Sequence, residues 1–501
     1  MSEAPPRAEP SEGSTEQVRR EKLARLRAEG IDPFPAKGFH DRDKISAILA
    51  AHDPGQLGEG EHSQWTYRIA GRVVGQRGHG KTIFFDVRDL TGSIQAYARK
   101  DSLGEEAFER IEELDIGDSV GIEGYLYVTK RGQLAIGVRE CRMLAKALRD
   151  PPDLFHGISD PEVRYRHREL DLMANERSRE IFLMRAKLVA AIRTYMNEHD
   201  FVEMETPMLQ SMTGGAAARP FVTHHNTLNR DLFLRPATEL YLKRCIIGGF
   251  ENVYELGKFF RNEGISPQHN PEFTMLEWFL SCADIEDVMA FAEGLISTVV
   301  EQVLGTTKVE RDGQTIDFKA PWKRLTLREA ILEETGLDIV SSSRDELAEL
   351  VPDDVDPKAD WAGVVDTIQG KLVEPKLIQP TFLRDLPLDI WPLVKPHPEH
   401  PELLGEAFDG IVAGMEITGG GTDINDPVEQ RRRFVEQRER QESGAEENPH
   451  EHDEEFVRAL EYGMLTASGC GLGVDRLMMI LSDSKTLRDV IMFPSMREKP
   501  S

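Results

Sequence analysis

The stretch FRNEGISPQHNPEFTMLEW, residues 260–278, gathers unlike functional side chains in one short window. It contains a guanidinium (Arg261), an imidazole (His269), an aromatic ring (Phe273) and carboxylates that include Glu263 and Glu277. A rigid guanidinium binds carboxylate or phosphate oxygens through paired hydrogen bonds. An aromatic face can stack on a purine, and carboxylates accept hydrogen bonds from amines. The window therefore predicts a site for a nucleoside triphosphate and a carboxylate substrate, with a surface hairpin held by salt bridges as the alternative.

A second window, GCGLGVDRLMMI (469–480), places closely spaced glycines directly before Arg476 and an apolar, helical run. Glycines let the backbone approach a ligand closely. The window matches neither the P-loop pattern nor the dinucleotide-binding pattern. Taken alone, it is better explained by close helix packing with a salt-bridged Arg476.

A third window, FDGIVAGMEITGGGTDINDP (408–427), carries Asp409 and Glu416 seven positions apart. On one continuous strand they would lie on opposite faces, unless a bulge or turn intervenes. Two carboxylates that converge beside a triphosphate would bind Mg²⁺, which prefers carboxylate and phosphate oxygens. An ordinary strand with surface acids is the alternative interpretation.

The 501 residues are too many for one ordinary core and indicate two or three domains. From Trp65 to Leu148 short β-rich runs alternate with turn sequences, a pattern that predicts five strands and suits a small closed barrel such as the OB-fold. Such barrels commonly bind oligonucleotides, although a barrel of another kind fits the pattern too. Beyond this region helical stretches alternate with β-like runs, which is typical of an α+β domain.

We therefore expect a disordered start and an N-terminal helical extension over residues 1–60 and a barrel over 61–148. A linker over 149–165 and one large domain over 166–501 should follow.

The overall composition limits the class of protein. The four cysteines are scattered without a CxxC pair, which argues against a structural zinc site and a disulfide framework and fits a reducing cytoplasm. The sequence contains no long apolar run of the kind that would predict a membrane span. The formal net charge of −27 argues against a nucleic-acid binder, but binding depends on a local basic patch and not on total charge.

Together the windows resemble the bacterial-type lysyl branch of the class II aminoacyl-tRNA synthetases (subclass IIb), from about Glu21 to Pro494. Three segments resemble class motifs 1, 2 and 3 in the right order: FVEMETPML (201–209) with Pro207, FRNE (260–263) and GLGVDR (471–476). Four more resemble the lysyl branch in particular: RYRHRELDL (164–172), TGGAAARPF (213–221), ELYLKR (239–244) and HNPEFTMLE (269–277).

The resemblance implies an α+β protein with an N-terminal OB-fold that binds the anticodon. A class II catalytic domain, an antiparallel sheet flanked by helices, should follow. The implied activity is conversion of L-lysine and ATP to lysyl-adenylate, with Mg²⁺, and transfer of lysine to the 3′ end of tRNA(Lys). It also implies a cytoplasmic homodimer, joined through the motif 1 region near Pro207, with no membrane association. A paralogue that activates another amine or modifies a protein acceptor is one alternative, and a non-catalytic RNA-binding regulator is another.

The resemblance also assigns roles to individual residues. The two arginines, Arg261 and Arg476, would be catalytic. The ATP site would comprise Arg261, Glu263, His269, Asn270, Phe273 and Arg476. The amino acid would be bound by Gly215, Glu239, Arg261, Glu277, Phe279 and Asp423. Magnesium would be held by Asp409 and Glu416. The anticodon would be bound by Arg77, Phe84, Gln95 and Gln133.

Several positions depart from the pattern of that branch. Phe279 stands where the family usually has Tyr, and Gly419, Gly421 and Asp423 stand where it usually has Asn, Phe and Glu. Because these changes shorten one acid and remove two side chains, they predict a wider pocket that holds lysine less tightly. Two further departures are Asp409 at the first magnesium position and Gln133 in the barrel, both where Glu is usual.

Overall fold

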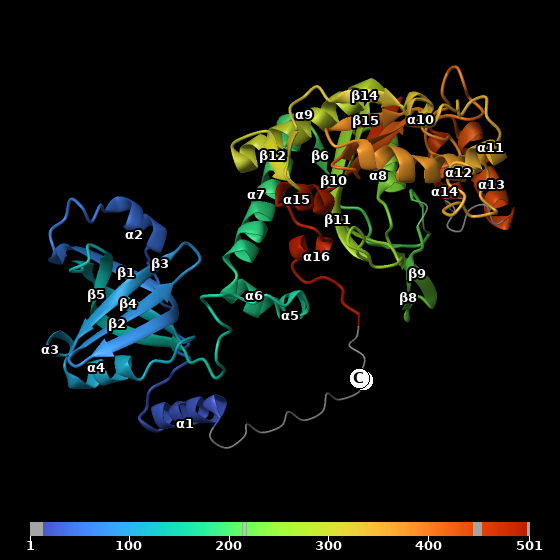
Figure 1. The fold of residues 1–501 in the computed structure, drawn as a ribbon. Coiled ribbons are helices and arrows are strands. Elements are labelled where there is room, and N and C mark those ends of the chain that lie inside the picture. Colours follow the sequence, from blue (N-terminus) through green and yellow to red (C-terminus); the bar gives the residue numbers. More distant parts are fainter. Residues whose placement is uncertain (1–13, 213, 217, 444–452, 498–501) are drawn as a thin grey trace. The chain divides into compact units, whose positions relative to one another are not determined.

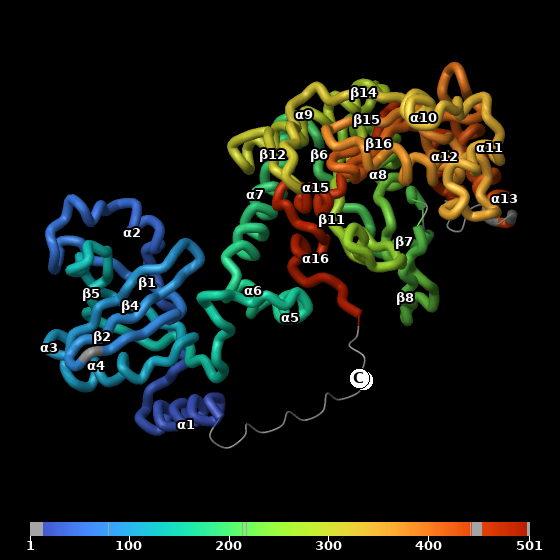
Figure 2. The backbone as a smooth tube through the Cα atoms, in the orientation of Figure 1, coloured from blue at the N-terminus to red at the C-terminus, as the bar shows by residue number. Residues whose placement is uncertain are grey.

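The computed structural model describes residues 14–212, 214–216, 218–443 and 453–497 (Figure 1). The start predicted to be disordered falls largely in residues 1–13, outside the described part. The chain divides into two compact units: Met1–Arg164 with Glu169–Asn175, and Tyr165–Arg168 with Glu176–Ser501. The backbone of each can be followed in Figure 2.

The first unit is built around a closed five-stranded barrel, which confirms the predicted OB-fold. Its strands are hydrogen-bonded in the order β1-β2-β3-β5-β4. In β2 and β3 buried and partly exposed side chains alternate, so that Ile83, Phe85 and Val87 fill the interior. The strands are β1 (Gly60–His79), β2 (Thr82–Arg88), β3 (Ser93–Arg99), β4 (Ser119–Val128) and β5 (Leu134–Ala145). The helices of this unit are α1 (Thr15–Ala28), α2 (Ile45–Ala51), α3 (Lys100–Leu103), α4 (Glu105–Glu112) and most of both α5 (Pro161–Arg166) and α6 (Arg168–Ala174).

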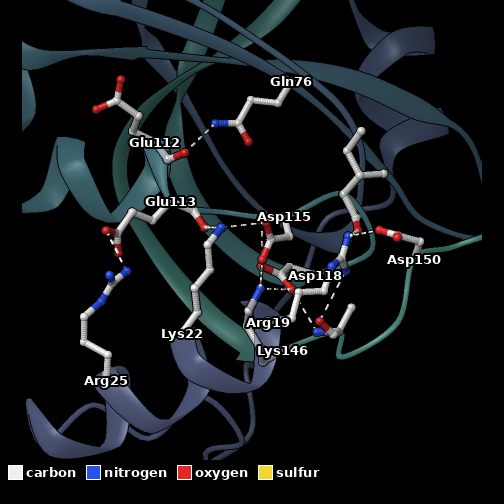
Figure 3. A network of polar contacts seen from close by, with 12 residues as sticks. Arg19, Lys22, Arg25, Gln76, Glu112, Glu113, Asp115, Asp118, Lys146 and Asp150 are labelled. Carbon is white, nitrogen blue, oxygen red and sulfur yellow. Dashed lines mark hydrogen bonds and ion pairs between the residues drawn. The ribbon is translucent and has the colours of Figure 1, made fainter. Parts of the chain in front are cut away.

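Helix α1 is fastened to the barrel by a buried arginine (Figure 3). Arg19 is only 5% exposed, and its guanidinium donates to the carbonyl oxygens of Ile116, Ala147 and Arg149. The same group pairs with Asp150 at 2.7 Å. Because a buried guanidinium needs acceptors for its several N–H groups, this set of contacts fixes the position of α1.

A second charged group is buried at the end of β5 (Figure 3). Lys146 Nζ lies 2.9 Å from Asp118 Oδ2 and also pairs with Asp115. The Asp118 side chain is fully buried and accepts a further hydrogen bond from the Ala147 N–H at 2.8 Å. The barrel thus contains a desolvated cation whose charge is matched by two carboxylates.

The second unit is organised by an eight-stranded sheet in the order β14-β15-β16-β17-β18-β11-β10-β6. Its neighbouring strands are antiparallel except for the pairs β10–β6 and β14–β15, which confirms the predicted antiparallel catalytic sheet. The strands are β6 (Val202–Glu203), β10 (Asn252–Phe260), β11 (Glu272–Ser281), β14 (Lys323–Thr326), β15 (Thr381–Arg384), β16 (Ala407–Val412), β17 (Met415–Thr422) and β18 (Ala467–Gly473).

Three helices share one hydrophobic core with this sheet: α7 (Glu176–Glu198), α9 (Ile285–Leu304) and α15 (Val474–Leu481). Helix α9 begins with a capping box between Asp284 and Asp287 and ends at Gly305 in the left-handed conformation. The fully buried Trp278 of β11 lies in the core that these helices cover.

Smaller elements complete the second unit. They are β7 (Leu209–Gln210), β8 (Phe221–His225), β9 (Arg230–Leu234), α8 (Glu239–Ile247), β12 (Lys308–Arg311), β13 (Gln314–Asp317), α10 (Leu327–Thr335), α11 (Arg344–Ala348), α12 (Trp361–Ile368), the π-helix η1 (Gln369–Val373), the 3-10 helix η2 (Glu374–Lys376), α13 (Pro427–Ser443), α14 (Glu454–Leu460) and α16 (Leu487–Val490). Among the described residues, no helix combines the length and the apolar character that crossing a membrane requires.

The buried cation of the barrel can be tested by substitution. Replacing Lys146 by Ala leaves the buried Asp118 without its counter-charge, so we expect the barrel to lose about 3–5 kcal/mol of stability. Hydrogen exchange measured by mass spectrometry should show faster exchange of the β4 and β5 amides. The matched control is Lys81→Ala, which removes an exposed pair with Asp101 and should cost less than about 1 kcal/mol. Equal exchange in the two variants would contradict the role assigned to Lys146.

Candidate active site

The hairpin of β10 and β11 positions the residues of the first window. Arg261 follows β10 directly, and its N–H donates to the Pro271 carbonyl at 2.9 Å. Its guanidinium carbon lies 5.2 Å from the centre of the Phe273 ring on β11. Burial lowers the pKa of Arg261, an effect opposed by Glu263 and Glu416. The Nε of Arg261 is buried without a hydrogen-bond partner, as is Oδ1 of Asn270, so polar groups here are left for a ligand to satisfy.

Arg476 enters the same site from the start of α15. Its guanidinium donates to the Glu416 carbonyl oxygen at 2.8 Å and to Glu416 Oε2 at 2.9 Å. A second nitrogen lies 3.3 Å from His269 Nε2. Burial and the charge of Arg476 lower the pKa of His269, so the imidazole is neutral at neutral pH. The second window therefore packs onto the first and third ones.

These side chains surround a cavity of about 170 Å³. Its lining includes every residue predicted to bind ATP: Arg261, Glu263, His269, Asn270, Phe273 and Arg476. Residues far apart in the sequence thus meet at one site. That convergence removes the main support for reading each window alone as a surface hairpin or as helix packing.

The two predicted magnesium ligands also meet, because a turn separates their strands. Asp409 lies on β16 and Glu416 on β17, with Ala413 and Gly414 at the turn between them. The register also shifts by one residue after Gly410, and both carboxylates line a second cavity. The two carboxylates could converge only if a bulge or turn lay between them, and this turn meets that requirement.

Asp409 has partners that the sequence did not indicate. It is 8% exposed and accepts a hydrogen bond of 2.8 Å from Gln369, which also donates to Glu374 at 3.1 Å. Burial raises the pKa of Asp409 well above its usual range, and the neighbouring Glu416 and Glu374 raise it further. The π-helix η1 carries Gln369, a residue that no motif in the sequence marks.

This donor set fits a divalent cation, because a bound cation would relieve the repulsion among the three carboxylates. No group of three or more His, Cys, Asp or Glu residues in the described ranges forms a metal-binding cluster by itself. Phosphate oxygens of a nucleotide would therefore have to complete the coordination of a magnesium ion.

The second cavity, of about 370 Å³, contains all the residues predicted to bind the amino acid. These are Gly215, Glu239, Arg261, Glu277, Phe279 and Asp423. Arg261 lines both cavities, and so do Glu416 and Gly471. The guanidinium of Arg261 is thus placed where two bound substrates could both contact it.

Glu277 is a buried acid oriented by one neighbour. It is 7% exposed, and its Oε2 accepts hydrogen bonds from both the N–H and the hydroxyl group of Thr238, the former at 2.8 Å. Burial raises the pKa of Glu277 to about 7, with a smaller contribution from Glu239. Thr238 was not recognised in the sequence, since it lies in no functional motif.

An internal lysine links two further acids of this pocket. Lys243 is fully buried, and its Nζ lies 2.6 Å from Glu239 Oε1 and 2.8 Å from Asp423 Oδ1. It also lies 5.6 Å from the centre of the Phe279 ring. Burial raises the pKa of Asp423, and the nearby charge of Lys243 opposes this rise. The second carboxylate oxygen of Asp423 is buried without a hydrogen-bond partner. The i, i+4 spacing to Glu239 in ELYLKR is the signal that could have revealed Lys243.

At the two glycines that are predicted to widen the pocket, side chains of another segment lie close by. A methyl group on Gly419 would lie 3.2 Å from Trp391 Cη2, and one on Gly421 would lie 2.9 Å from Val394 Cγ1. Side chains from another segment therefore stand against the positions that lost their own. The sequence could not indicate this, because Trp391 and Val394 belong to no recognised motif.

On the barrel, the predicted anticodon-binding residues Phe84, Arg77 and Gln95 lie on neighbouring strands. Phe84 stacks on Tyr97 with ring centres 4.8 Å apart, and Arg77 lies 5.9 Å from the Phe84 ring. Phe84 is partly exposed between the buried Ile83 and Phe85, so it is not a residue of the barrel interior.

Gln95 and Gln133 have different surroundings. Gln95 donates to Asp86 at 3.3 Å. Gln133 is exposed in the turn before β5, two residues ahead of Ala135, which pairs with Gln95.

Comparison with known proteins agrees with this geometry. Residues 160–497 match the family of class II tRNA synthetases (D, K and N), and residues 67–144 match the OB-fold nucleic acid binding domain. The chain is 44% identical over 488 residues to a lysine–tRNA ligase of Pelotomaculum thermopropionicum, covering 96% of this chain and 94% of the relative. It is 44% identical over 493 residues to that of Staphylococcus saprophyticus (96% and 98%), and 43% over 484 residues to that of Dehalococcoides mccartyi (96% of each). The chain therefore belongs to the class II tRNA synthetases (D, K and N).

Proposed function

We propose that this chain activates L-lysine with ATP to form lysyl-adenylate and then transfers the lysyl group to the 3′ end of tRNA(Lys). The observation that carries this proposal is the position of Arg261, which lines both cavities. A guanidinium shared by two sites can contact the α-phosphate of ATP and the carboxylate of the amino acid at once. The full-length similarity to lysine–tRNA ligases supports the choice of amino acid.

The first step would be an in-line displacement. The amino-acid carboxylate attacks the α-phosphorus of ATP, a P–O bond forms, and pyrophosphate leaves. Because a carboxylate is already ionised at neutral pH, this step needs no general base among the side chains. Arg261 and Arg476 would orient the reacting groups and neutralise negative charge as it develops.

We further propose that Asp409 and Glu416 hold Mg²⁺, with Glu374 as a third carboxylate beside them. A bound Mg²⁺ would neutralise phosphate charge. In the protein's own part of the site, Gln369 holds Asp409 and Glu374 by hydrogen bonds, and Arg476 holds Glu416. In the first cavity, Phe273 would stack on the adenine ring of ATP, with Glu263, His269 and Asn270 around it.

Recognition of lysine would depend on the acids of the second cavity. A substrate ammonium that is removed from water needs a matched negative charge. Glu277 offers the carboxylate oxygen that Thr238 does not hold, and Asp423 offers an oxygen without a partner. Glu239 and Gly215 complete the predicted contacts at this end.

We propose that residues 61–148 bind the anticodon and that residues 166–501 form the catalytic domain. The aromatic face with Phe84, Arg77 and Gln95 suits the stacking of unpaired bases. This face also favours a tRNA acceptor over a protein acceptor. The two complete cavities argue against a non-catalytic regulator.

We also propose a homodimer through the motif 1 region near Pro207. Val202, Met208 and Leu209 expose between 45% and 49% of their surface there, as expected of side chains that a partner covers. A cytoplasmic location is proposed as well, because all four cysteines are free.

The role of Arg261 predicts a severe local defect. Arg261→Ala should reduce lysine-dependent ATP–pyrophosphate exchange by about 10²-fold or more, since one preorganised charge is lost from the transition state. The control Arg432→Ala removes an exposed arginine of α13 and should leave exchange unchanged. Near-normal exchange in Arg261→Ala would exclude the proposed contact.

The buried Glu277 predicts a pH dependence. Because its pKa is raised to about 7, the group is largely protonated below this pH and ionised above it. Only the ionised form attracts an ammonium group, so kcat/KM for lysine should rise between about pH 6 and pH 8. The KM for ATP should change less. Glu277→Gln should weaken the dependence and leave the part that is due to Asp423, whose pKa burial also raises. A flat profile for lysine in the unaltered protein would argue against this role of Glu277.

The aromatic face of the barrel predicts a defect confined to tRNA. Phe84→Ala should lower kcat/KM for tRNA charging by about 5- to 100-fold, the value of one stacked base. Exchange without tRNA should be unaffected. The control Phe155→Ala removes a ring that is 90% exposed outside the barrel strands. If charging by Phe84→Ala equals that of the control, the ring does not bind a base.

A further inference from the structure

Trp391 forms a wall of the second cavity and belongs to the segment between β15 and β16. Its N–H donates to the Leu388 carbonyl at 3.1 Å, and its carbonyl accepts from the Val394 N–H at 3.2 Å. The following residue is Pro392, which restricts the backbone of Trp391 to extended conformations. The indole is therefore held on a tight, locally hydrogen-bonded turn.

The same segment is attached to the end of β17. The Lys395 N–H donates to the Thr422 carbonyl at 2.7 Å, and the Ile424 N–H donates to the Leu393 carbonyl at 3.0 Å. These two bonds lie on either side of Asp423. The wall and the acid are consequently fixed to each other through the backbone.

The indole stands against the strand at a position where no side chain competes with it. Gly419 and Gly421 lie two positions apart on β17, and Asp423 follows directly after this strand. All three residues line the cavity. A Cβ added to Gly419 would lie 3.2 Å from Trp391 Cη2 and 2.9 Å from Asp409 Oδ1. Trp391 and Gly419 thus form a matched large and small pair.

The chemistry of this arrangement fits an aliphatic chain that ends in a cation. An indole offers a broad apolar surface, and its face also attracts cations. Farther along the strand, Asp423 has a buried oxygen without a hydrogen-bond partner. Phe279 adds a second aromatic side chain to the same cavity.

We infer that Trp391 is a specificity-determining residue, whose indole packs along the stem of the bound amino acid and excludes stems that carry a branch. This inference rests on the proposed activation of lysine in the same cavity. A residue outside the class motifs, Trp391, would then set the width of the pocket.

The test compares lysine with 5-hydroxylysine and 4-methyl-lysine, whose stems are branched, in ATP–pyrophosphate exchange. Trp391→Ala should raise the KM for lysine by about 10-fold or more, because the stem loses an apolar contact. The kcat/KM of the branched analogues relative to lysine should rise by about 10-fold. The KM for ATP should stay within about 2-fold of the unaltered protein, which a general loss of structure would not allow.

Milder variants guard against misfolding and provide a matched control. Trp391→Leu and Trp391→Phe keep apolar volume and should show the same trend to a smaller extent. Trp361→Phe alters another tryptophan that packs against the same hydrophobic cluster but does not line the cavity, and it should leave the relative activities unchanged.

The outcomes separate the two proposals. Absence of lysine-dependent exchange in the unaltered protein would refute the proposed function itself. Exchange with lysine but unchanged relative activities in all three Trp391 variants would refute only the role of Trp391.

Discussion

The active site depends on a close approach of backbones at the centre of the large sheet. Where β17 meets β18, a methyl group on Gly420 would lie 2.1 Å from the Gly469 carbonyl oxygen. A methyl group on Gly469 would in turn lie 2.0 Å from the Phe279 ring of β11. These strands can therefore pair only without side chains at these positions. Gly420 and Gly469 also line the second cavity, which therefore lies directly on the backbone of the sheet.

Charge is the second organising factor of the site. Burial raises the pKa of the acids Asp409, Glu277 and Asp423, and each has at least one specific partner: Gln369, Thr238 or Lys243. Acids buried in this way are poised to accept cations, because binding one relieves both desolvation and mutual repulsion. The positive groups Arg261 and Arg476 meet this acidic region where the two cavities adjoin.

The sequence predicted the fold class and which residues would come together, because class motifs place catalytic residues on particular strands. It did not predict the supporting residues Thr238, Gln369 and Trp391, which reach the site by tertiary packing and belong to no motif. For the same reason it did not reveal which side chain lies against Gly419. A missing side chain can be read from a sequence, whereas the side chain that fills its space comes from a distant segment.

The buried contacts of Arg19 bear on the order in which the parts of the first unit fold. The carbonyl groups that bind this guanidinium belong to residues 97 to 130 positions later in the chain. During synthesis from the N-terminus, α1 is made well before β5 and cannot dock until the barrel has closed. Contacts of such long sequence separation form late and slow the folding of a domain. The N-terminal helix would thus dock last, on a completed barrel, and would not nucleate the folding of the barrel.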